Sequence, residues 1–263
     1  MNNIPKIIHF YWGSTVLPYL RYMSLYSFKK FNPDWEVRLY IPTKLVISKS
    51  WNDPWNKTEL HAEDYMDRVT DIATVLSFDM ESIGYNNEIS EVIKSDIVRL
   101  YLLSEIGGVW SDLDIIFFKP ISFGIPNLDF TAMFCNHGFH SIGFLAGALG
   151  NIAFQELFSK VKSFYNYSQY EGAGSLFYNK QVVMNSLVYN LPMEVVYPQD
   201  YNFAESMVTS PASEKLSYIK ENTIGWHWYA GNPVCGEFQN VCTETTYKNY
   251  NNIITYLIGK VIE

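Results

Sequence analysis

The chain has 263 residues, of which 48 % are apolar and 17 % are charged. This balance excludes disorder as the main state, and the length suits one large domain. The net charge of −8 leaves no basic surplus for a large nucleic-acid footprint. Nucleic acid is therefore not expected as a partner.

The lack of a targeting pattern and the number of cysteines predict where in the cell the protein lies. Apolar runs are too short for a transmembrane helix, and Met1 to Lys6 lacks the pattern of a signal peptide. Cys135, Cys235 and Cys242 have no zinc-binding spacing, and an odd count without a secretory signal fits a reducing compartment. We expect a cytoplasmic protein, with peripheral membrane contact left open.

The N-terminal segment has the pattern of a strand–helix–strand unit. A strand is predicted from Ile7 to Trp12, a helix over Tyr19–Phe31 and a second strand over Val37–Ile41. Asn32-Pro33 ends the predicted helix. Such a unit favours a parallel sheet.

After residue 42 the sequence predicts a less regular segment, followed by alternating helices and strands. Residues 43–88 are expected to form a helical insertion or lid with a helix from about Thr70 to Met80. A helix over Ser90–Glu105, with Ser90 as N-cap, ends at Gly107-Gly108. The further expectations are a helix over Ile152–Phe164 and strands over Val109–Phe118 (with an irregularity inside it), Phe130–Phe134, Phe144–Leu149 and Glu194–Tyr197. Alternating strands and helices predict an α/β fold.

A carboxylate interrupts the apolar stripe of the helix over Ser90–Glu105. Asp96 lies in the middle of the stripe made by Ile89, Val92, Ile93, Leu100 and Leu103. A buried carboxylate is costly unless it is paired, and Arg99 at position i+3 can reach it. The pair is either a structural anchor of the helix or part of the lining of a nucleotide pocket.

A second pair of carboxylates follows the glycines. In an extended chain Asp112 and Asp114 would point to one face, ~7 Å apart along the strand. Their neighbours are apolar, and Mg²⁺ or Mn²⁺ would relieve the repulsion between two poorly solvated carboxylates. The alternative is a solvated turn that carries two acids.

The two pairs are close in sequence. The helix that carries Asp96 and Arg99 leads through Gly107-Gly108 directly to Asp112 and Asp114. Glycine allows a sharp turn and a close approach of backbone. All four polar residues can therefore meet at the carboxyl end of a strand, where α/β sheets bind ligands.

These residues resemble a known family. The run Lys94-Ser-Asp96-Ile-Val-Arg99, followed by Gly107-Gly108-Val-Trp-Ser-Asp112-Leu-Asp114, resembles the core of Asp-x-Asp sugar transferases. The resemblance is to glycosyltransferase family 32 and its relatives, which include yeast outer-chain mannosyltransferases, α1,4-galactosyltransferases and large glucosylating toxins. The opening strand from Ile4 to Gly13 and the segment from Gly225 to Gly231 resemble further motifs of this group, in the same order.

The resemblance implies one GT-A glycosyltransferase domain over residues 1–263, with a Rossmann-like sheet that binds a nucleotide sugar. It implies retaining transfer of a hexose from a nucleotide diphosphate sugar to a hydroxyl of a glycan or lipid-linked acceptor. A UDP-sugar is favoured as donor, and GDP-mannose is the alternative. Mn²⁺ or Mg²⁺ would be the cofactor. The product would be a cell-surface or viral glycan.

The resemblance also implies roles for single residues. Asp112 would contact the ribose and approach the metal, Asp114 would ligate the metal, and Arg99 would lie near sugar or phosphate oxygens; these three form the expected catalytic group. Asp96 would hold the nucleotide sugar together with Arg99. Trp12 would stack on the base or border it.

Late residues complete the expected site. His227 would contact the metal or the diphosphate, although a packed histidine between Trp226 and Trp228 is the alternative. Gly172 or Gly174 would approach the donor through backbone N–H groups, or would form a plain turn. Acceptor stacking is considered for Trp51, Trp55, Tyr165, Tyr167 and Tyr170, with ordinary packing as the alternative for each.

The chain departs from the family pattern in places, and other functions are weighed. Asn232-Pro233 stands where the family has Ser-Trp, and Glu171 to Ser175 contains no Thr-Gly-Pro step. A catalytically degenerate nucleotide-sugar-binding protein is the main alternative. An Asp-x-Asp phosphatase fits less well, because Ile116 stands where that chemistry needs a small hydroxyl residue.

Overall fold

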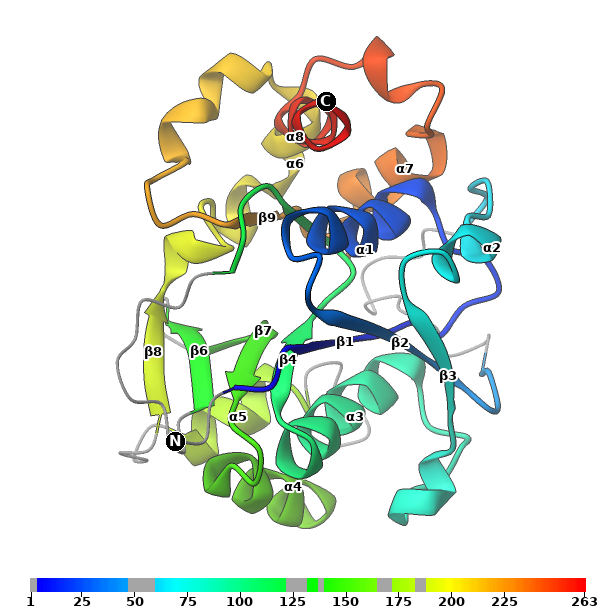
Figure 1. Ribbon diagram of the computed structural model, residues 1–263, viewed down its shortest axis with the longest axis vertical. Helices are drawn as coiled ribbons and strands as arrows, with labels where there is room; N and C mark the ends of the chain where they lie inside the picture. Colours follow the sequence, from blue (N-terminus) through cyan, green and yellow to red (C-terminus); the bar gives the residue numbers. More distant parts are fainter. Residues whose placement is uncertain (1–3, 47–59, 122–131, 137–139, 165–171, 183–187) are drawn as a thin grey trace.

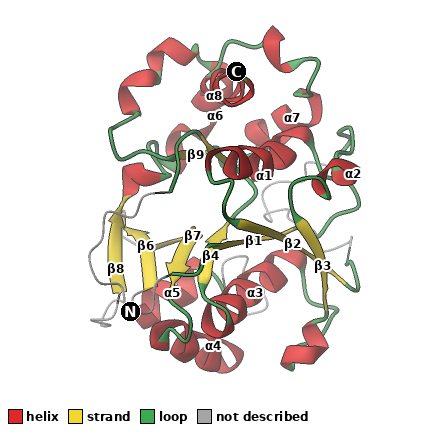
Figure 2. Cartoon of the chain, viewed as in Figure 1, coloured by secondary structure: helices red, strands yellow, loops and turns green. Residues whose placement is uncertain are grey.

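The computed structural model describes residues 4–46, 60–121, 132–136, 140–164, 172–182 and 188–263. In these ranges the strands form a central band with helices on both sides (Figures 1 and 2). The main sheet has seven strands in the order β3-β2-β1-β4-β7-β6-β8. Their bounds are Ile7–Tyr11 (β1), Glu36–Pro42 (β2), Thr74–Phe78 (β3), Gly108–Ser111 (β4), Ala132–Asn136 (β6), His140–Gly147 (β7) and Val188–Pro192 (β8).

The main sheet is parallel on one side and mixed on the other. Strands β3, β2, β1 and β4 run parallel, and His9 of β1 is paired with Trp110 of β4. Strand β7 is antiparallel to both β4 and β6, while β8 is parallel to β6. A separate ribbon pairs β5 (Ile115–Phe117) with β9 (Gly225–His227). This architecture confirms the predicted α/β class.

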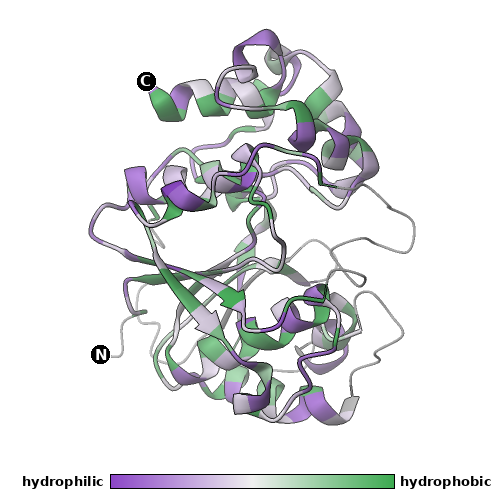
Figure 3. Cartoon of the chain, turned by 90° about the vertical axis from the view of Figure 1, so that its right-hand side faces the viewer, coloured by the Kyte–Doolittle hydropathy of each residue, from purple (hydrophilic) through white to green (hydrophobic). Residues whose placement is uncertain are grey.

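Two groups of helices cover the sheet. Helices α3 (Glu91–Glu105), α4 (Ile152–Phe164) and α5 (Ser175–Val182) lie on one side. On the other side are α1 (Tyr19–Phe31), α6 (Ala204–Thr209), α7 (Pro233–Val241) and α8 (Ile253–Ile262), whereas the short α2 (Met66–Val69) lies at the margin. The side view shows the C-terminus across the strands from the lower helices (Figure 3). Each group has its own buried apolar cluster.

The Gly107-Gly108 turn joins α3 to β4 under tight constraints. Gly107 and Gly108 have φ angles of 68° and 98°, a region that favours glycine. A Cβ on Gly108 would lie 2.6 Å from the carbonyl oxygen of Ile7. The buried His9 donates through Nε2 to the carbonyl of Gly107 at 2.8 Å and accepts through Nδ1 from the hydroxyl of Tyr40 at 3.2 Å. The turn is thus fixed to β1, as the paired glycines predict.

Several predicted elements are confirmed. The helices over Tyr19–Phe31 and Ile152–Phe164 have the predicted bounds, and the first two strands agree to within a residue or two. Helix α3 starts after Ser90, but the Ser90 side chain makes no capping hydrogen bond. The strand expected at Phe144 begins earlier, at His140. The strand expected over Phe130–Phe134 lies partly outside the described residues, and β6 begins at Ala132.

Other predictions are wrong. The helix expected from Thr70 to Met80 is instead strand β3, which pairs with β2; its half-exposed residues give no clear two-residue alternation. The strand expected over Glu194–Tyr197 is a helical turn in which Tyr197 N donates to the carbonyl of Met193 at 2.8 Å. The single strand expected over Val109–Phe118 is divided into β4 and β5, which belong to different sheets.

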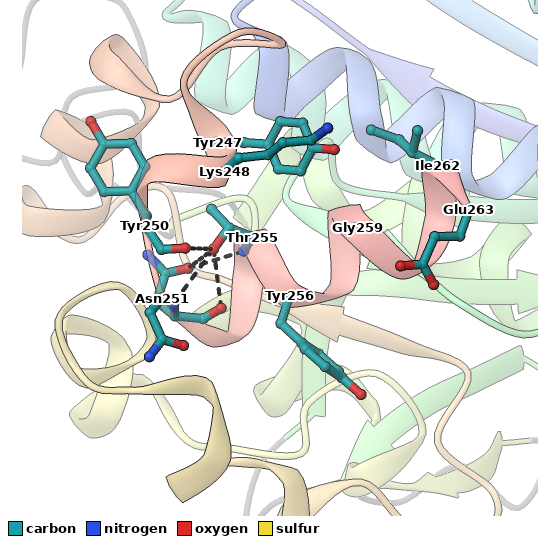
Figure 4. Close-up of a pocket in the computed structure, with 10 residues that line it drawn as sticks. Tyr247, Lys248, Tyr250, Asn251, Thr255, Tyr256, Gly259, Ile262 and Glu263 are labelled. Atoms are coloured by element: carbon teal, nitrogen blue, oxygen red, sulfur yellow. Dashed lines mark hydrogen bonds between the residues drawn. The ribbon is translucent and has the colours of Figure 1, made fainter.

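The C-terminal helix is capped and packed against α1. The Asn252 side chain accepts from the N–H of Thr255 at 3.0 Å, and the Thr255 hydroxyl also contacts the carbonyl of Tyr250 at 2.9 Å. Figure 4 shows these contacts at the edge of a surface hollow between the segment 247–252 and α8. In the described ranges no helix has the length and apolar character needed to cross a bilayer.

The pH dependence of stability tests the role of His9. Burial lowers the pKa of His9 from 6.5 to about 4, so the folded state holds the ring neutral. The unfolded state takes up a proton as the pH falls below 6.5, and the stability contributed by the neutral ring is lost between pH 6.5 and 4. At pH 5 this loss is about 2 kcal/mol. His9→Gln should lack this part of the pH dependence in denaturant titrations.

The control for this prediction is His61→Gln, which changes an exposed histidine. That variant should keep the wild-type dependence on pH. An equal loss of stability between pH 7 and pH 5 in wild type and His9→Gln would contradict the role given to His9.

Candidate metal and donor site

Asp112 and Asp114 lie in the turn between β4 and β5 rather than on a continuous strand. Because β5 pairs with β9 and Ile115 is opposite His227, the late histidine is brought beside the Asp-x-Asp turn. Nε2 of His227 is 3.1 Å from Oδ1 of Asp114. Asp112, Asp114 and His227 each offer one ligand atom, and these atoms lie within 4.8 Å of one another.

The two oxygens of Asp114 have different environments. Oδ2 accepts from the backbone N–H of Ala230 at 3.0 Å and lies 3.9 Å from NH1 of Arg21. Oδ1 is buried and faces Nε2 of His227 at 3.1 Å. Burial by itself raises the pKa of this carboxyl, but His227, Arg21 and the Ala230 N–H outweigh it and hold the pKa below its usual range. Asp114 is therefore a buried carboxylate with one oxygen held and one available.

Asp112 is held by a similar combination of groups. Its Oδ1 accepts from the indole N–H of Trp110 at 3.0 Å and lies 3.3 Å from NH1 of Arg99. Its backbone N–H donates to the carbonyl of Gly143 at 2.8 Å. The side chain is 30 % exposed, against 10 % for Asp114. Asp112 is thus the more accessible of the two carboxylates.

Arg99 links the two predicted clusters. NH2 of Arg99 lies 2.9 Å from Oδ1 of Asp96, so the ion pair predicted from the i+3 spacing is present. The guanidinium also donates to the carbonyl of Ile142 at 2.6 Å and to the hydroxyl of Ser95 at 3.0 Å. It lies over the ring of Trp110, 4.9 Å from the centroid. Arg99 therefore orients Asp96 and Asp112, and its contact with a donor stays a prediction.

Helix α1 fixes the backbone of the Asp-x-Asp turn, which the sequence did not predict. The buried Ser24 hydroxyl donates to the carbonyl of Leu113, between the two acids, at 2.9 Å. The hydroxyl of Ser27 accepts from the N–H of Phe117 at 3.0 Å. Arg21 lies one turn before Ser24. Polar residues at i, i+3 and i+6 on the buried face of the helix were the available signal.

The other predicted donor-binding residues lie around this centre. Trp12 is 2 % exposed, and its indole N–H donates to the carbonyl of Val16 at 2.9 Å. A Cβ on Gly174 would lie 2.7 Å from Oδ2 of Asp96, so this glycine permits a close approach to the acid. Gly172 is buried nearby in the chain. Their contacts with a donor stay predictions.

The donor set fits a divalent cation. Two carboxylates suit Mn²⁺ or Mg²⁺, and the imidazole of His227 lies beside them, 3.1 Å from the buried Oδ1 of Asp114. Nδ1 of His227 accepts from the N–H of Tyr229 at 3.3 Å. Ligation through Nε2 requires the ring proton to move to Nδ1, so this weak contact would have to break. Tyr229 has a φ of 52°, which marks backbone strain beside the site.

The departure at Asn232-Pro233 has a structural explanation. The Asn232 side chain accepts from the N–H groups of Val234 at 3.0 Å and Cys235 at 3.4 Å. Pro233 occupies the first turn of α7, where its missing N–H costs nothing. This pair therefore begins a helix. The aromatic residues considered for acceptor stacking (Trp51, Trp55, Tyr165, Tyr167 and Tyr170) lie outside the described residues.

Comparison with known proteins agrees with this geometry. Residues 23–133 match the family model described as the glycosyltransferase sugar-binding region containing a DXD motif. This region includes Asp96, Arg99, Asp112 and Asp114. No curated protein matches the sequence.

Solved structures of glycosyltransferases are similar in fold. PaToxG glycosyltransferase is 16 % identical with a TM-score of 0.50, and the match covers 97 % of this chain and 87 % of that one. The WbbM bifunctional glycosyltransferase is 10 % identical with a TM-score of 0.52, over 98 % of this chain and 50 % of that one. GlyE of Streptococcus pneumoniae TIGR4 is 10 % identical with a TM-score of 0.51, over 99 % and 61 %.

This chain spans only part of the length of WbbM and GlyE. At such low identity these structures establish the GT-A fold alone. The match to the DXD sugar-binding region, over residues 23–133, adds the sequence evidence that the chain is a glycosyltransferase. The resemblance and the fold class predicted from the sequence are confirmed.

A single methyl group tests the packing around Asp112. A Cβ on Gly143 would lie 2.8 Å from Oδ2 of Asp112 and 2.5 Å from the hydroxyl of Tyr197, so Gly143→Ala must displace both groups. Such overpacking costs about 1–3 kcal/mol of stability. A displaced ligand should weaken Mn²⁺ binding by about 10-fold or more. Thermal unfolding and Mn²⁺ titration measure the two effects.

The matched control is Gly259→Ala in α8, where a Cβ would meet nothing within 4 Å. This variant should gain about 0.5–1 kcal/mol, because alanine favours helix, and should bind Mn²⁺ like wild type. Unchanged Mn²⁺ binding in Gly143→Ala would contradict the placement of Asp112 in the metal site.

Proposed function

We propose that the protein is a metal-dependent, retaining hexosyltransferase that uses a nucleotide diphosphate sugar. A UDP-sugar is the favoured donor and GDP-mannose the second candidate, with a hydroxyl of a glycan or lipid-linked molecule as acceptor. The observation that supports this most is the convergence of Asp112, Asp114 and His227, drawn from β4–β5 and β9, on one point at the end of the parallel strands. Ligands of open α/β sheets bind at such ends.

Asp112, Asp114 and His227 would hold Mn²⁺ or Mg²⁺. When bound, the cation supplies positive charge where the nucleoside diphosphate leaves with its electron pair. Asp96 would bind hydroxyls of the transferred sugar, since its carboxylate is fixed by Arg99 at 2.9 Å. Arg99 would orient the carboxylates of Asp96 and Asp112. Its guanidinium would bind donor oxygens only if it gave up one of its hydrogen bonds or ion pairs within the protein.

Trp12 and the glycines complete the proposed donor site. Trp12 follows β1 directly, at the same edge of the sheet as Asp112, and would border the base. Gly174 would contribute its backbone beside Asp96, and Gly172 would extend the same turn.

Retention of configuration fits a front-face route. The acceptor hydroxyl would attack the anomeric carbon from the side of the leaving diphosphate, as the bond to that diphosphate breaks. The hydroxyl proton would pass to the leaving phosphate oxygen. The sugar carries oxocarbenium character at that moment, so the route needs no protein nucleophile.

We also propose that residues 1–263 act as one GT-A unit in the cytoplasm, with peripheral membrane contact at a lipid-linked acceptor left open. The thiols of Cys235 and Cys242 are free and buried, as a reducing compartment favours. Burial raises the pKa of each thiol to about 12, which makes both unreactive.

Removal of the buried ligand tests the proposed activity. Asp114→Ala should lower the release of nucleoside diphosphate from the preferred donor by at least about 100-fold, since charge at the leaving group is lost. A panel of UDP- and GDP-sugars with Mn²⁺, and with EDTA, identifies that donor in wild type. Activity should require Mn²⁺ and disappear in EDTA.

Asp34→Ala, at an exposed acid paired with Lys6, is the control and should keep full activity. Full turnover in Asp114→Ala, or turnover that persists in EDTA, would refute the proposed mechanism. Binding of a donor without turnover, in the presence of acceptor glycans, would favour the degenerate binding protein.

A further inference from the structure

Arg21 is a buried cation beside the Asp-x-Asp turn. It lies on α1, and its side chain is 11 % exposed. The guanidinium carbon is 5.1 Å from the ring centroid of Trp12 and 5.2 Å from that of Trp228. Nε donates to Oε1 of Gln239 at 3.1 Å. These contacts with two indole rings and an amide hold the guanidinium in one position. Together they offset the conformational entropy that the side chain loses when it is fixed.

The position of Arg21 matters because of the oxygen that it approaches. NH1 lies 3.9 Å from Oδ2 of Asp114, the oxygen that also accepts from the N–H of Ala230. The other oxygen, Oδ1, faces His227 and the ligand cluster. Arg21 therefore holds the outer side of the carboxylate and leaves the inner side for a ligand.

Charge at the site gives Arg21 opposite effects on two ligands. A fixed guanidinium repels a divalent cation that binds the same carboxylate. Both side chains are nearly buried, so solvent screens this repulsion only weakly. A nucleoside diphosphate carries negative charge and is attracted by the guanidinium and the divalent cation together. Arg21 thus disfavours binding of the divalent cation alone and favours binding of the cation together with a diphosphate.

We propose that Arg21 is a positioning residue that makes metal binding depend on the nucleotide. It orients Asp114, weakens binding of the divalent cation alone and strengthens binding of the cation together with a nucleoside diphosphate. This inference rests on the proposed function, because it requires the metal site at Asp112, Asp114 and His227. It gives the enzyme a means to load metal and donor as a unit.

The test measures Mn²⁺ affinity from the electron paramagnetic resonance signal of free Mn²⁺, without and with UDP. In wild type, UDP should raise the affinity for Mn²⁺. Arg21→Met should bind Mn²⁺ alone about 10-fold more tightly, because the repulsion is removed. The enhancement by UDP at a fixed, sub-saturating concentration should shrink, because the diphosphate loses its attraction to the guanidinium. Arg21→Lys keeps the charge and should bind Mn²⁺ alone like wild type.

Two further variants keep the result interpretable. Arg38→Met removes an arginine that pairs with Glu36 on β2, far along the chain from the ligand cluster, and should leave Mn²⁺ binding unchanged. Arg21→Gln is a second neutral variant that keeps hydrogen-bonding groups near Gln239. It replaces Arg21→Met in the test if circular dichroism shows that Arg21→Met is unfolded.

The outcomes separate this inference from the proposed function. Equal or weaker binding of Mn²⁺ alone in a folded neutral variant would overturn the role of Arg21 and leave the metal site intact. Wild type that binds no Mn²⁺, even with UDP, would instead remove the proposed metal site itself.

Discussion

Two buried arginines hold the three aspartates of the site, and the guanidinium of each arginine also lies over the ring of a tryptophan. Arg99 pairs with both Asp96 and Asp112 and lies over the ring of Trp110, while Arg21 lies beside Asp114 between Trp12 and Trp228. Buried carboxylates so close together would repel strongly without compensating charge. The arginines therefore balance the negative charge of three neighbouring acids and leave carboxylate oxygens for ligands. Breaking one pair by removing a single partner leaves an uncompensated buried charge, which is far more costly than losing the contact.

The rest of the fold supplies the positions that these pairs need. Helix α3 presents Asp96 and Arg99 on its buried face, and the fixed Gly107-Gly108 turn returns the chain to Asp112. Helix α1 contributes Arg21 and holds the Asp-x-Asp turn through Ser24. The short β5–β9 ribbon places His227 next to Asp114 across more than a hundred residues of sequence. Helices from both sides of the sheet and the β5–β9 ribbon thus meet at the site. Because these elements are rigid, they can hold ligands with a defined geometry.

The sequence was informative where local spacing determines the contact. The pair Asp96–Arg99 and the Gly107-Gly108 turn follow from helix periodicity and glycine conformation, and both were predicted. The division of Val109–Phe118 into two strands was foreseen only as an irregularity, because the partner β9 is distant in sequence. Arg21 was missed for the same reason: its role depends on Trp228 and Gln239 near the C-terminus. Strand β3 was mistaken for a helix, since a half-exposed strand lacks a clear period and its pairing with β2 decides its conformation.

The central claim is that Asp112, Asp114 and His227 hold one divalent cation against the leaving diphosphate. Anomalous diffraction from crystals grown with Mn²⁺ and UDP tests it most directly. We predict one manganese peak within bonding distance of oxygens of Asp112 and Asp114, adjacent to His227 and to the UDP phosphates. UDP bound without manganese among these residues, or manganese bound only elsewhere, would contradict the account.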